Sequence, residues 1–413
     1  MKKTCSYLVL LICIFSCIFL SSSIFPVQAL SISDADAAFV AYLNTFYDAD
    51  ARFFYADTSR SSYNDFWREA VSWDVVMDAY QRTHSPAYRQ LLDDVYNGFM
   101  LRNPDMSTAC NTSNAFVLQD NYNDDIGWWA NASIRAYHLT GDERYLHCSQ
   151  RLFDSIYIYW DTGTLGGGIW WTRSAATQKN VATNAPAAMT AAQLADALGD
   201  RRYLDKAKAI YNWVKNTLTD QAGTVNDGYD SGSLYTWQFS YNYGTYIGAA
   251  TALYRSTHDQ AYLDDAQAAA NVSLTNLTIG GILQGEGAGD GGGFKGIYAR
   301  YMEEYAQVAQ QSQFTHFLQR SADVAWSNRG PDDLVGPDWM TTLPFGLLDT
   351  HTAGSLVALL QVLPAHTDTA GVAGGRRPMA GGSGVSPAQS SPLFSQPAAG
   401  GLRAPEELSI EDR

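Results

Sequence analysis

The chain has few charged residues, and few of those are positive. Asp, Glu, Lys and Arg make up 17% of its 413 residues, and 27 Lys and Arg stand against 42 Asp and Glu, which gives a net charge of −15. An acidic chain is repelled by the phosphates of nucleic acids and of anionic lipids. Aromatic residues, by contrast, reach 13%, which argues against a disordered chain. The composition favours a folded protein with a neutral partner.

Cysteine is also scarce, with five residues, three of them within 1–29. This segment starts with two lysines, continues with the apolar run Tyr7–Leu20, which is too short for a comfortable membrane span, and ends in a small-residue cleavage pattern at Val27 to Ala29. We predict a secretory signal peptide over 1–29. The remaining Cys110 and Cys148 are then in an oxidising compartment, where we predict that they form a disulfide.

Two further features fit secretion. Asn-x-Ser/Thr sequons occur at Asn111, Asn131, Asn271 and Asn276, and we expect glycans at all of them except Asn131, which follows two tryptophans in an inward-facing helix. Residues 366–413 are rich in Gly, Pro, Ser and Ala, and we predict a disordered tail there. The tail has no terminal apolar run of the length that a lipid anchor requires, so we expect a released protein.

Residues 30–365 contain a repeat. A similar segment begins with an aromatic residue at positions 88, 145, 203, 262 and 317, spaced 57, 58, 59 and 55 residues apart, and Leu directly follows the aromatic residue in all but the first. Periods of this size indicate stacked supersecondary units. Apolar residues recur at helical spacing in twelve segments. These segments are 33–47, 65–81, 86–101, 125–139, 142–159, 185–198, 200–217, 241–256, 259–276, 294–311, 314–327 and 351–363.

The twelve segments alternate in character. Odd-numbered segments carry charge on one face, whereas several even-numbered ones are apolar nearly all round, as helices buried on every side are. Six alternations of an outer and an inner helix predict an all-α, single-domain (α/α)6 toroid over 30–365. An open α-solenoid has the same repeat, so ring closure is an expectation here.

The connections between these segments are asymmetric. Links from even to odd segments are tight, whereas links from odd to even segments are long and rich in Gly and aromatic residues, and all of them lead into inner helices. We therefore expect the long loops on one rim, where a functional site is favoured. The long links are 102–124, 160–184, 218–240, 277–293 and 328–350.

Two adjacent carboxylates, Asp124 and Asp125, stand at the start of the fourth predicted helix. Adjacent side chains diverge on a helix, so the two carboxylates can approach a bound bond from different sides. The helix N-terminus favours the ionised form of one carboxyl group, and the charge of that carboxylate disfavours ionisation of the other. One member of the pair can therefore act as a nucleophile or base and the other as an acid. Glycoside hydrolysis needs this division, and carboxylates about 5 Å apart select the retaining route.

The same pair has a structural interpretation, because Asp is favoured as a helix cap and in the first turn. A prenyl-diphosphate site would need a third Asp where Trp128 stands, which argues against that chemistry. Secretion, low charge and an aromatic rim favour sugars, whose apolar ring faces stack on Trp and Tyr.

Five segments support a more specific interpretation, and they lie in order within about 35–363: Asp124–Trp129, Gly166–Trp171, Asn226–Gly228, Tyr241–Gly244 and Phe294–Arg300. They resemble motifs of glycoside hydrolase family 76, the endo-α-1,6-mannanases and related fungal cell-wall proteins. The resemblance implies an (α/α)6 fold, retaining cleavage of α-1,6-linked mannan, Asp124 as the nucleophile and Asp125 as the general acid/base. The Gly-rich stretch Gly287–Gly293 departs from the family pattern, in which polar residues are more frequent.

We expect substrate contacts from residues of these motifs. Trp170 and Trp171 are interpreted as stacking platforms, although packing inside the loop explains them equally well. Asp227 and Asn242 are interpreted as contacts to sugar hydroxyls. The expected substrate-binding residues are Trp128, Trp129, Trp170, Trp171, Asp227, Tyr241, Asn242, Lys295 and Arg300.

Charged residues complete this picture. Lys295 and Arg300 are interpreted as cations at the rim. Asp74, Asp78 and His351 are candidates for lining the funnel, or else are polar groups satisfied inside the core.

The leading hypothesis is a secreted, monomeric hydrolase that acts on α-mannan polysaccharide or mannoprotein glycans, outside the cell or at the cell wall. We expect no cofactor, no metal ion, no nucleic acid and no stable membrane association. One alternative is a wall transglycosidase that passes the glycosyl intermediate to another glycan, and the lack of an anchor signal favours hydrolysis over it. The other is a non-catalytic mannan-binding wall protein, against which the presence of both Asp124 and Asp125 argues.

Overall fold

The computed structural model describes residues 31–112, 118–342 and 346–364, which contain thirteen helices and seven short strands. The chain divides into the units Met1–His366 and Thr367–Arg413, and the second unit lies outside the described residues.

The predicted signal peptide, 1–29, and the predicted tail, 366–413, also lie outside the described residues. Both therefore remain predictions.

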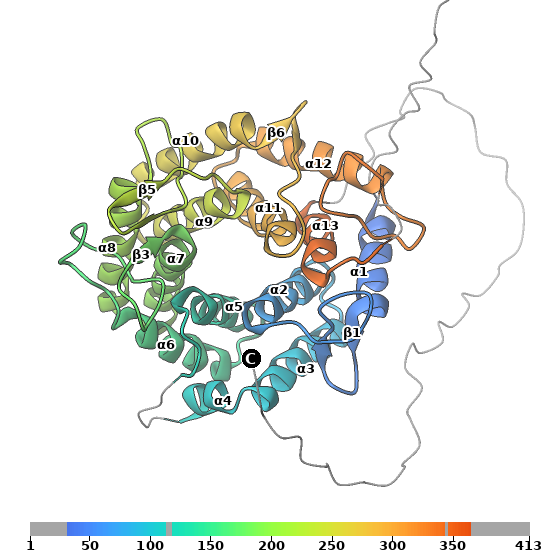
Figure 1. Cartoon of the computed structure of the whole chain (residues 1–413), viewed down its shortest axis with the longest axis horizontal. Helices are drawn as coiled ribbons and strands as arrows, with labels where there is room; N and C mark the ends of the chain where they lie inside the picture. The colour runs from blue at the N-terminus through green and yellow to red at the C-terminus, as the bar shows by residue number, and fades with distance from the viewer. Residues whose placement is uncertain (1–30, 113–117, 343–345, 365–413) are drawn as a thin grey trace, which may run out of the picture. The chain divides into compact units, whose positions relative to one another are not determined.

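Six inner helices form a ring around the centre of the first unit (Figure 1). Each packs against the next, and α13 packs against α2, so the ring is closed. The toroid is thus confirmed, and the open solenoid is excluded. The inner helices are α2 (Phe66–Thr83), α5 (Asn123–Thr140), α7 (Val181–Leu198), α9 (Ser240–Thr257), α11 (Asp290–Val308) and α13 (Thr350–Val362).

Six outer helices surround the inner ring (Figure 1). Each packs against inner helices: α8 against α7, for example, and α10 against α9. They correspond to the odd-numbered predicted segments. The outer helices are α1 (Ile32–Phe46), α3 (Pro86–Arg102), α6 (Glu143–Tyr157), α8 (Arg201–Leu218), α10 (Gln260–Asn276) and α12 (Ser312–Ser327).

The pattern of apolar residues explains these two layers. In α9 every residue from Ser240 to Leu253 is buried, which matches a helix that has neighbours on all sides. In α8 the buried residues recur at helical spacing, among them Tyr203, Ala207 and Ile210, and most of the residues between them are charged. This second helix therefore buries a single stripe against the inner ring.

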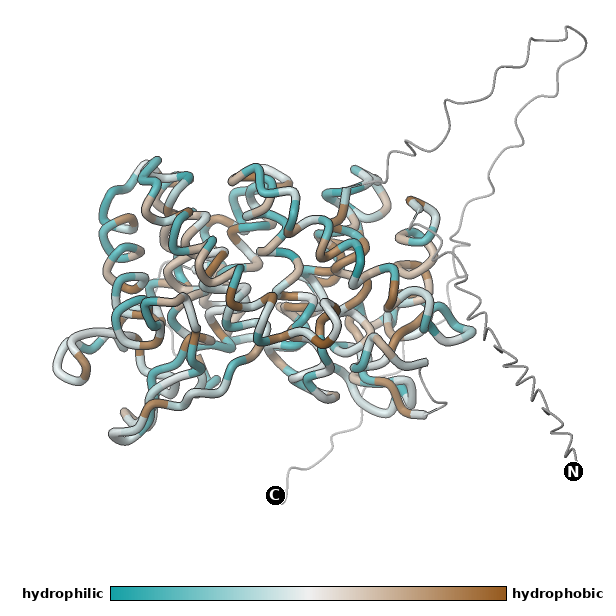
Figure 2. The backbone as a smooth tube through the Cα atoms, turned by 90° about the horizontal axis from the view of Figure 1, so that it is seen from above, coloured by the Kyte–Doolittle hydropathy of each residue, from teal (hydrophilic) through white to brown (hydrophobic). Residues whose placement is uncertain are grey.

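The short turns have a common construction. His84, Gly141, Gly199 and His258 end inner helices in the left-handed backbone conformation. In three of the four turns the next residue is an Asp whose carboxylate caps the following outer helix. These turns lie along one edge of the unit, where residues are mainly hydrophilic (Figure 2). The repeated Asp of the sequence is therefore a helix cap.

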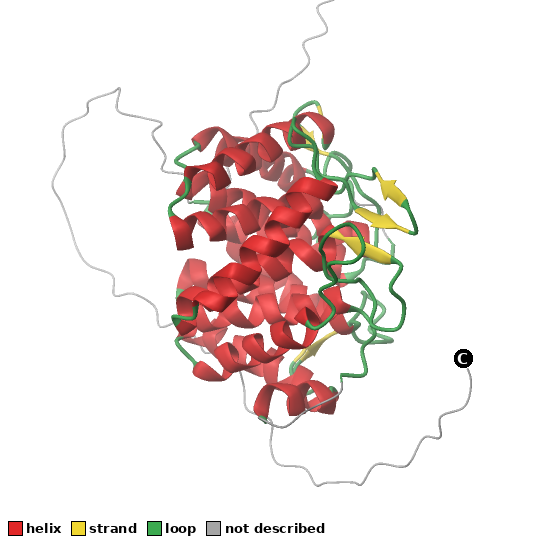
Figure 3. Cartoon of the chain, turned by 90° about the vertical axis from the view of Figure 1, so that its left-hand side faces the viewer, coloured by secondary structure: helices red, strands yellow, loops and turns green. Residues whose placement is uncertain are grey.

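The long loops and the strands gather at the opposite end of the helices (Figure 3). Besides the five long links predicted from the sequence, residues 47–65 form a sixth on this rim. β3 joins β4 and β5 in an antiparallel sheet, whereas the remaining strands form two separate pairs. The strands are β1 (Tyr47–Asp48), β2 (Phe53–Phe54), β3 (Gln178–Asn180), β4 (Gly228–Asp230), β5 (Ser233–Tyr235), β6 (Thr278–Ile279) and β7 (Ile282–Leu283).

The largest differences from the predicted helix boundaries are one additional short helix and two early starts, one of which is α7, which begins at Val181 rather than at 185. The short helix α4 (Pro104–Asn111) lies within a predicted loop, and the predicted disulfide between Cys110 and Cys148 links it to α6. The inner helix α11 starts at Asp290, inside the Gly-rich stretch, rather than at 294.

Close packing explains this early start of α11. A Cβ atom on Gly292 would lie 1.8 Å from Oγ1 of Thr352, and one on Gly293 would lie 1.9 Å from Nε2 of His351. The glycines therefore allow the first turn of α11 to lie against the first turn of α13.

Within 31–112, 118–342 and 346–364, no helix combines the length and the apolar composition that crossing a bilayer requires.

Candidate active site

Asp124 and Asp125 lie in the first turn of α5, on the rim that carries the long loops. The N-cap position of this helix is Tyr122, which makes no side-chain cap hydrogen bond. The amide N–H of Asp125 donates to Oδ1 of Asp124 at 3.1 Å. The two aspartates are therefore first-turn residues, and neither serves as the N-cap.

The aromatic loop before α7 is attached to this helix start. The backbone N–H of Asn123 donates to the carbonyl of Trp171 at 2.8 Å, and the Asn123 side chain donates to the carbonyl of Trp170 at 2.9 Å. Arg173 donates to the amide oxygen of Asn123 at 2.9 Å. These bonds fix the loop against the first turn of α5.

Trp171 contacts one of the two carboxylates directly. Its indole Nε1 donates to Oδ2 of Asp124 at 2.9 Å, and its ring packs against Tyr122 with centroids 5.1 Å apart. Trp171 is half-buried. The loop residue expected to stack on a sugar therefore also orients a carboxylate.

The two carboxyl groups have different electrostatic environments. Burial raises the pKa of Asp124, and the hydrogen bonds from Trp171 and from the Asp125 amide oppose that rise. Burial also raises the pKa of Asp125, and the negative charge of Asp124 raises it further. Among the described residues, no hydrogen-bond donor contacts the Asp125 carboxyl. Burial and charge therefore raise the pKa of Asp125 above that of Asp124, so Asp125 is the member of the pair that holds a proton more firmly.

More acidic groups stand near the pair. The charges of Asp65 and Asp290 contribute to the raised pKa of Asp125. Nη2 of Arg68 binds Oδ1 of Asp290 at 2.6 Å, and Nε of Arg68 lies 3.5 Å from Oδ2 of Asp65. Arg68 therefore holds the first turns of α2 and α11 together beside the aspartates.

Asp227, Tyr241 and Asn242 form a second polar group. The Tyr241 hydroxyl donates to Oδ1 of Asp227 at 2.8 Å, and the Asn242 amide donates to the same oxygen at 3.1 Å. Burial raises the pKa of Asp227. The charge of Asp124 is one of the causes that raise the pKa of Tyr241, so this group lies within electrostatic reach of the pair.

Two supporting residues have no signal in the sequence motifs. Nζ of Lys179, fully buried, donates to Oδ2 of Asp161 at 3.0 Å and to the carbonyl of Gly167 at 2.5 Å, and it lies 4.3 Å from the Trp170 ring centroid. Glu286 accepts hydrogen bonds from the backbone and the hydroxyl of Ser240, the first residue of α9. Each organises a loop through contacts that sequence spacing does not show.

Several residues that we expected to contact substrate are buried and bind other residues of the protein instead. Trp129 is fully buried, stacks on Phe99 with centroids 3.6 Å apart, and donates its Nε1 to the carbonyl of Phe66. Lys295 is buried, donates to the carbonyl of Pro337 at 2.7 Å and lies over a tryptophan ring. Trp128 is buried too, and packs on Trp67.

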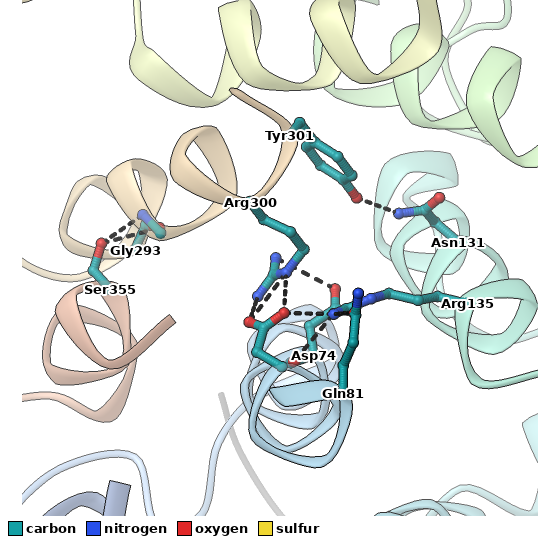
Figure 4. A network of polar contacts seen from close by, with 10 residues as sticks. Asp74, Gln81, Asn131, Arg135, Gly293, Arg300, Tyr301 and Ser355 are labelled. Atoms are coloured by element: carbon teal, nitrogen blue, oxygen red, sulfur yellow. Dashed lines mark hydrogen bonds and ion pairs between the residues drawn. The ribbon is translucent and has the colours of Figure 1, made fainter. Parts of the chain in front are cut away.

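Arg300 lies in the middle of the ring rather than on the rim. It binds Asp78 with Nη2 to Oδ2 at 2.6 Å, and Nη1 lies 3.8 Å from Oδ2 of Asp74. Arg135 binds the same two aspartates (Figure 4). These ion pairs join α2, α5 and α11. Asp74 and Asp78, which we expected to line a funnel, are therefore neutralised by two arginines inside the ring.

A cavity of about 860 Å³ opens on the side of the short turns. Asp78, Arg135 and Arg300 are among its lining residues, whereas Asp124 and Asp125 are not. The two ends of the ring therefore differ in chemistry, with the aspartate pair at the end of the long loops.

The remaining predicted residues fall into two groups. His351 is buried, packs on Trp67, and has no hydrogen-bond partner at either ring nitrogen. The sequon residues Asn111, Asn271 and Asn276 are exposed, whereas Asn131 is buried and donates to Tyr301 at 2.6 Å.

No metal site is visible in the described part of the chain. None of its groups of three or more His, Cys, Asp and Glu residues is arranged to hold a metal ion.

The sequence and the fold are similar to those of known proteins. The pattern of glycosyl hydrolase family 76 matches residues 31–368. The chain is 23% identical over 287 residues to the mannan endo-1,6-alpha-mannosidase DCW1 of Candida glabrata, with 63% of each protein covered. The chain thus spans less than two thirds of that relative's length.

Solved structures match over a larger share. The GH76A alpha-1,6-mannanase of Salegentibacter sp. HEL1_6 has 32% identity and a TM-score of 0.72, with 80% of this chain and 98% of that one covered. An inactive variant of it, in which two consecutive aspartates are replaced by asparagine, was solved with alpha-1,6-mannotriose and matches with 31% identity, a TM-score of 0.73 and the same coverage.

Proposed function

The chain belongs to glycosyl hydrolase family 76, and we therefore propose that it is a secreted endo-α-1,6-mannanase that cleaves mannan with retention of configuration. Asp124 is the nucleophile and Asp125 the general acid/base. The substrate is the α-1,6-linked backbone of a mannan polysaccharide or a mannoprotein glycan.

The unequal hydrogen bonding of the two aspartates carries the proposal. Both oxygens of Asp124 accept a hydrogen bond, one from Trp171 and one from the Asp125 amide, and both bonds favour its ionised form. Burial and the negative charges of neighbouring aspartates, first among them Asp124, all raise the pKa of Asp125. A charged nucleophile next to a protonated acid is the arrangement that the first step of a retaining glycosidase requires.

The two steps follow from these protonation states. In the first, a carboxylate oxygen of Asp124 bonds to C1 of the mannosyl unit while the C1–O bond to the leaving sugar breaks, and Asp125 gives its proton to the leaving oxygen. In the second, Asp125 takes a proton from water, the hydroxide oxygen bonds to C1, and the ester to Asp124 breaks. Both aspartates return to their starting protonation states.

The relatives support the substrate and the pair. The similar mannanase from Salegentibacter is inactive when two consecutive aspartates are replaced, and that variant binds α-1,6-mannotriose. Asp124 and Asp125 are consecutive aspartates on a rim rich in aromatic residues.

Product stereochemistry tests the proposal. The protein is incubated with α-1,6-mannan in an NMR tube, and the anomeric signals of the first products are followed before mutarotation. Retention gives the α-anomer first. Appearance of the β-anomer first overturns the retaining assignment, and the absence of any cleavage of α-1,6-mannan overturns the substrate assignment. An added mannooligosaccharide acceptor, with products separated by size, distinguishes transfer to sugar from hydrolysis.

A further inference from the structure

The hairpin formed by β4 and β5 carries an exposed aromatic pair. The Trp237 side chain, just beyond β5, keeps 62% of its surface exposed. The Tyr235 ring lies nearly parallel to it, with centroids 5.2 Å apart and an angle of 12° between the planes. Tyr235 therefore covers one face of the indole and leaves the other open to solvent.

The hairpin holds this pair in a fixed position. β4 pairs with β3 as well as with β5, which makes a three-stranded sheet among the long loops (Figure 3). The carbonyl of Trp237 accepts a hydrogen bond of 2.9 Å from the amide of Asp227. The Tyr235 hydroxyl contacts Asp230 at 3.4 Å. An aromatic surface anchored in this way loses little conformational freedom when a ligand binds.

Contacts connect the pair to the aspartates. Asp227, which is bonded to the Trp237 carbonyl, accepts the hydroxyl of Tyr241, a residue within electrostatic reach of Asp124. On the other side of the sheet, the backbone N–H of Trp171 donates to the carbonyl of Gln178 in β3 at 2.8 Å. The loop that orients Asp124 and the hairpin that carries Trp237 therefore share one sheet.

The chemistry of the hairpin fits an uncharged sugar. The open ring face is apolar, and the exposed neighbours Ser233 and Thr236 bear hydroxyls that can exchange hydrogen bonds with sugar hydroxyls. The carboxylate of Asp230 and the net charge of −15 disfavour anionic lipids and phosphates. A pyranose ring presents C–H groups on one face and hydroxyls at its edge, which matches this surface.

We propose that Tyr235 and Trp237 form a stacking platform for a mannose unit of the substrate chain away from the cleaved bond. This inference rests on the proposed function. The platform would make the protein prefer chains that are long enough to reach both the aspartate pair and the hairpin.

Chain-length preference tests the platform. The measurement is the ratio of kcat/KM on α-1,6-mannan polysaccharide to kcat/KM on α-1,6-mannotriose for the full chain. We expect this ratio to fall roughly three- to tenfold in Trp237→Ala, the usual contribution of one aromatic stacking contact. Ile279→Ala is the matched control, since Ile279 is 57% exposed on β6–β7, the next hairpin along the chain, and we expect no change of the ratio.

The remaining outcomes separate the platform from the proposed function. An unchanged ratio in Trp237→Ala, or an equal fall in Ile279→Ala, overturns the platform. Migration of each variant through a gel that contains α-1,6-mannan reports binding without catalysis. If the unaltered chain is retarded but cleaves nothing, the proposed function fails, and loss of retardation in Trp237→Ala still supports the platform. If Trp237→Ala is retarded as strongly as the unaltered chain, this result also overturns the platform. Melting curves of all variants verify folding, and Trp237→Phe, which keeps an aromatic face, should retain part of the ratio.

Discussion

The indole Nε1 of Trp171 donates a hydrogen bond of 2.9 Å to Oδ2 of Asp124. This bond joins the loop before α7 to the first turn of α5, and it acts on one member of the aspartate pair only. Trp171 therefore has two properties that bear on function: it stabilises the charged form of Asp124, and it presents an aromatic ring at the same place.

Removal of the Trp171 bond should change the pH dependence of the reaction. In Trp171→Phe the ionised form of Asp124 loses a donor, so the pKa of Asp124 rises further above its ordinary value. Because the first step needs Asp124 ionised, the acidic limb of the kcat/KM profile should move to higher pH. Trp170→Phe is the control, since it leaves the bond to Asp124 in place. A profile with the same acidic limb in Trp171→Phe and in the unaltered chain would contradict this role.

Replacement of each aspartate should separate the two roles. Asp124→Asn and Asp125→Asn should each lower kcat by several orders of magnitude, roughly 4 kcal/mol or more of transition-state stabilisation. With an activated mannoside, whose leaving group needs no proton, the first step should recover in Asp125→Asn and not in Asp124→Asn. Release of the leaving group measures that step. Equal recovery in both variants would refute the assigned roles. Near-normal activity in either variant would show that the replaced aspartate has only a structural role in the first turn of the helix.

The close approach of α11 to α13 should be sensitive to a single methyl group. Gly292→Ala places a Cβ atom 1.8 Å from Oγ1 and 3.0 Å from Cα of Thr352, so the backbones must separate. We expect a loss of about 1–3 kcal/mol in the free energy of unfolding, measured by denaturant titration. Gly127→Ala is the control, because its nearest neighbour is Cδ1 of Ile156 at 3.7 Å. Equal stability of the two variants would show that the contact is not tight.

The disulfide should stabilise the fold through the unfolded chain. Cys110 and Cys148 are 38 residues apart in sequence, and closing a loop of this length contributes about 4 kcal/mol in the chain-entropy model. The Cys110→Ala/Cys148→Ala variant should therefore melt at a lower temperature than the oxidised protein. A reducing agent should lower the melting temperature of the unaltered protein and leave that of the variant unchanged. An equal response of both proteins would exclude the disulfide as the cause.

Much of the fold was predictable because its signals are local. The apolar periodicity located the twelve helices of the two layers, and the Asp residues at the short turns marked the starts of outer helices such as α6 and α8. Closure was not predictable from these signals, since it depends on the contact between α13 and α2. The start of α11 was placed too late, because a run of glycines disfavours a helix unless a neighbouring helix packs as closely as α13 does here.

The site was predictable in part, for a similar reason. The position of Asp124 and Asp125 at a helix start was visible in the sequence, as was the aromatic character of the rim. The engagement of Arg300 was not, because its partner Asp78 is 222 residues away in sequence. Lys179 was also missed, since a lysine before a helix gives no sign that its ammonium group will be enclosed by the carbonyls of a loop.

The contact between α2 and α13 also governs the order in which the protein can be made. In an open array of repeats, each unit can fold on its neighbour as soon as it leaves the ribosome. Here α2, which is synthesised early, packs against α13, whose last residue is Val362. Until then a nascent chain exposes an apolar edge at each end, and these edges are suited to pairing with another nascent chain. The ring can therefore close only after the last helix has been synthesised.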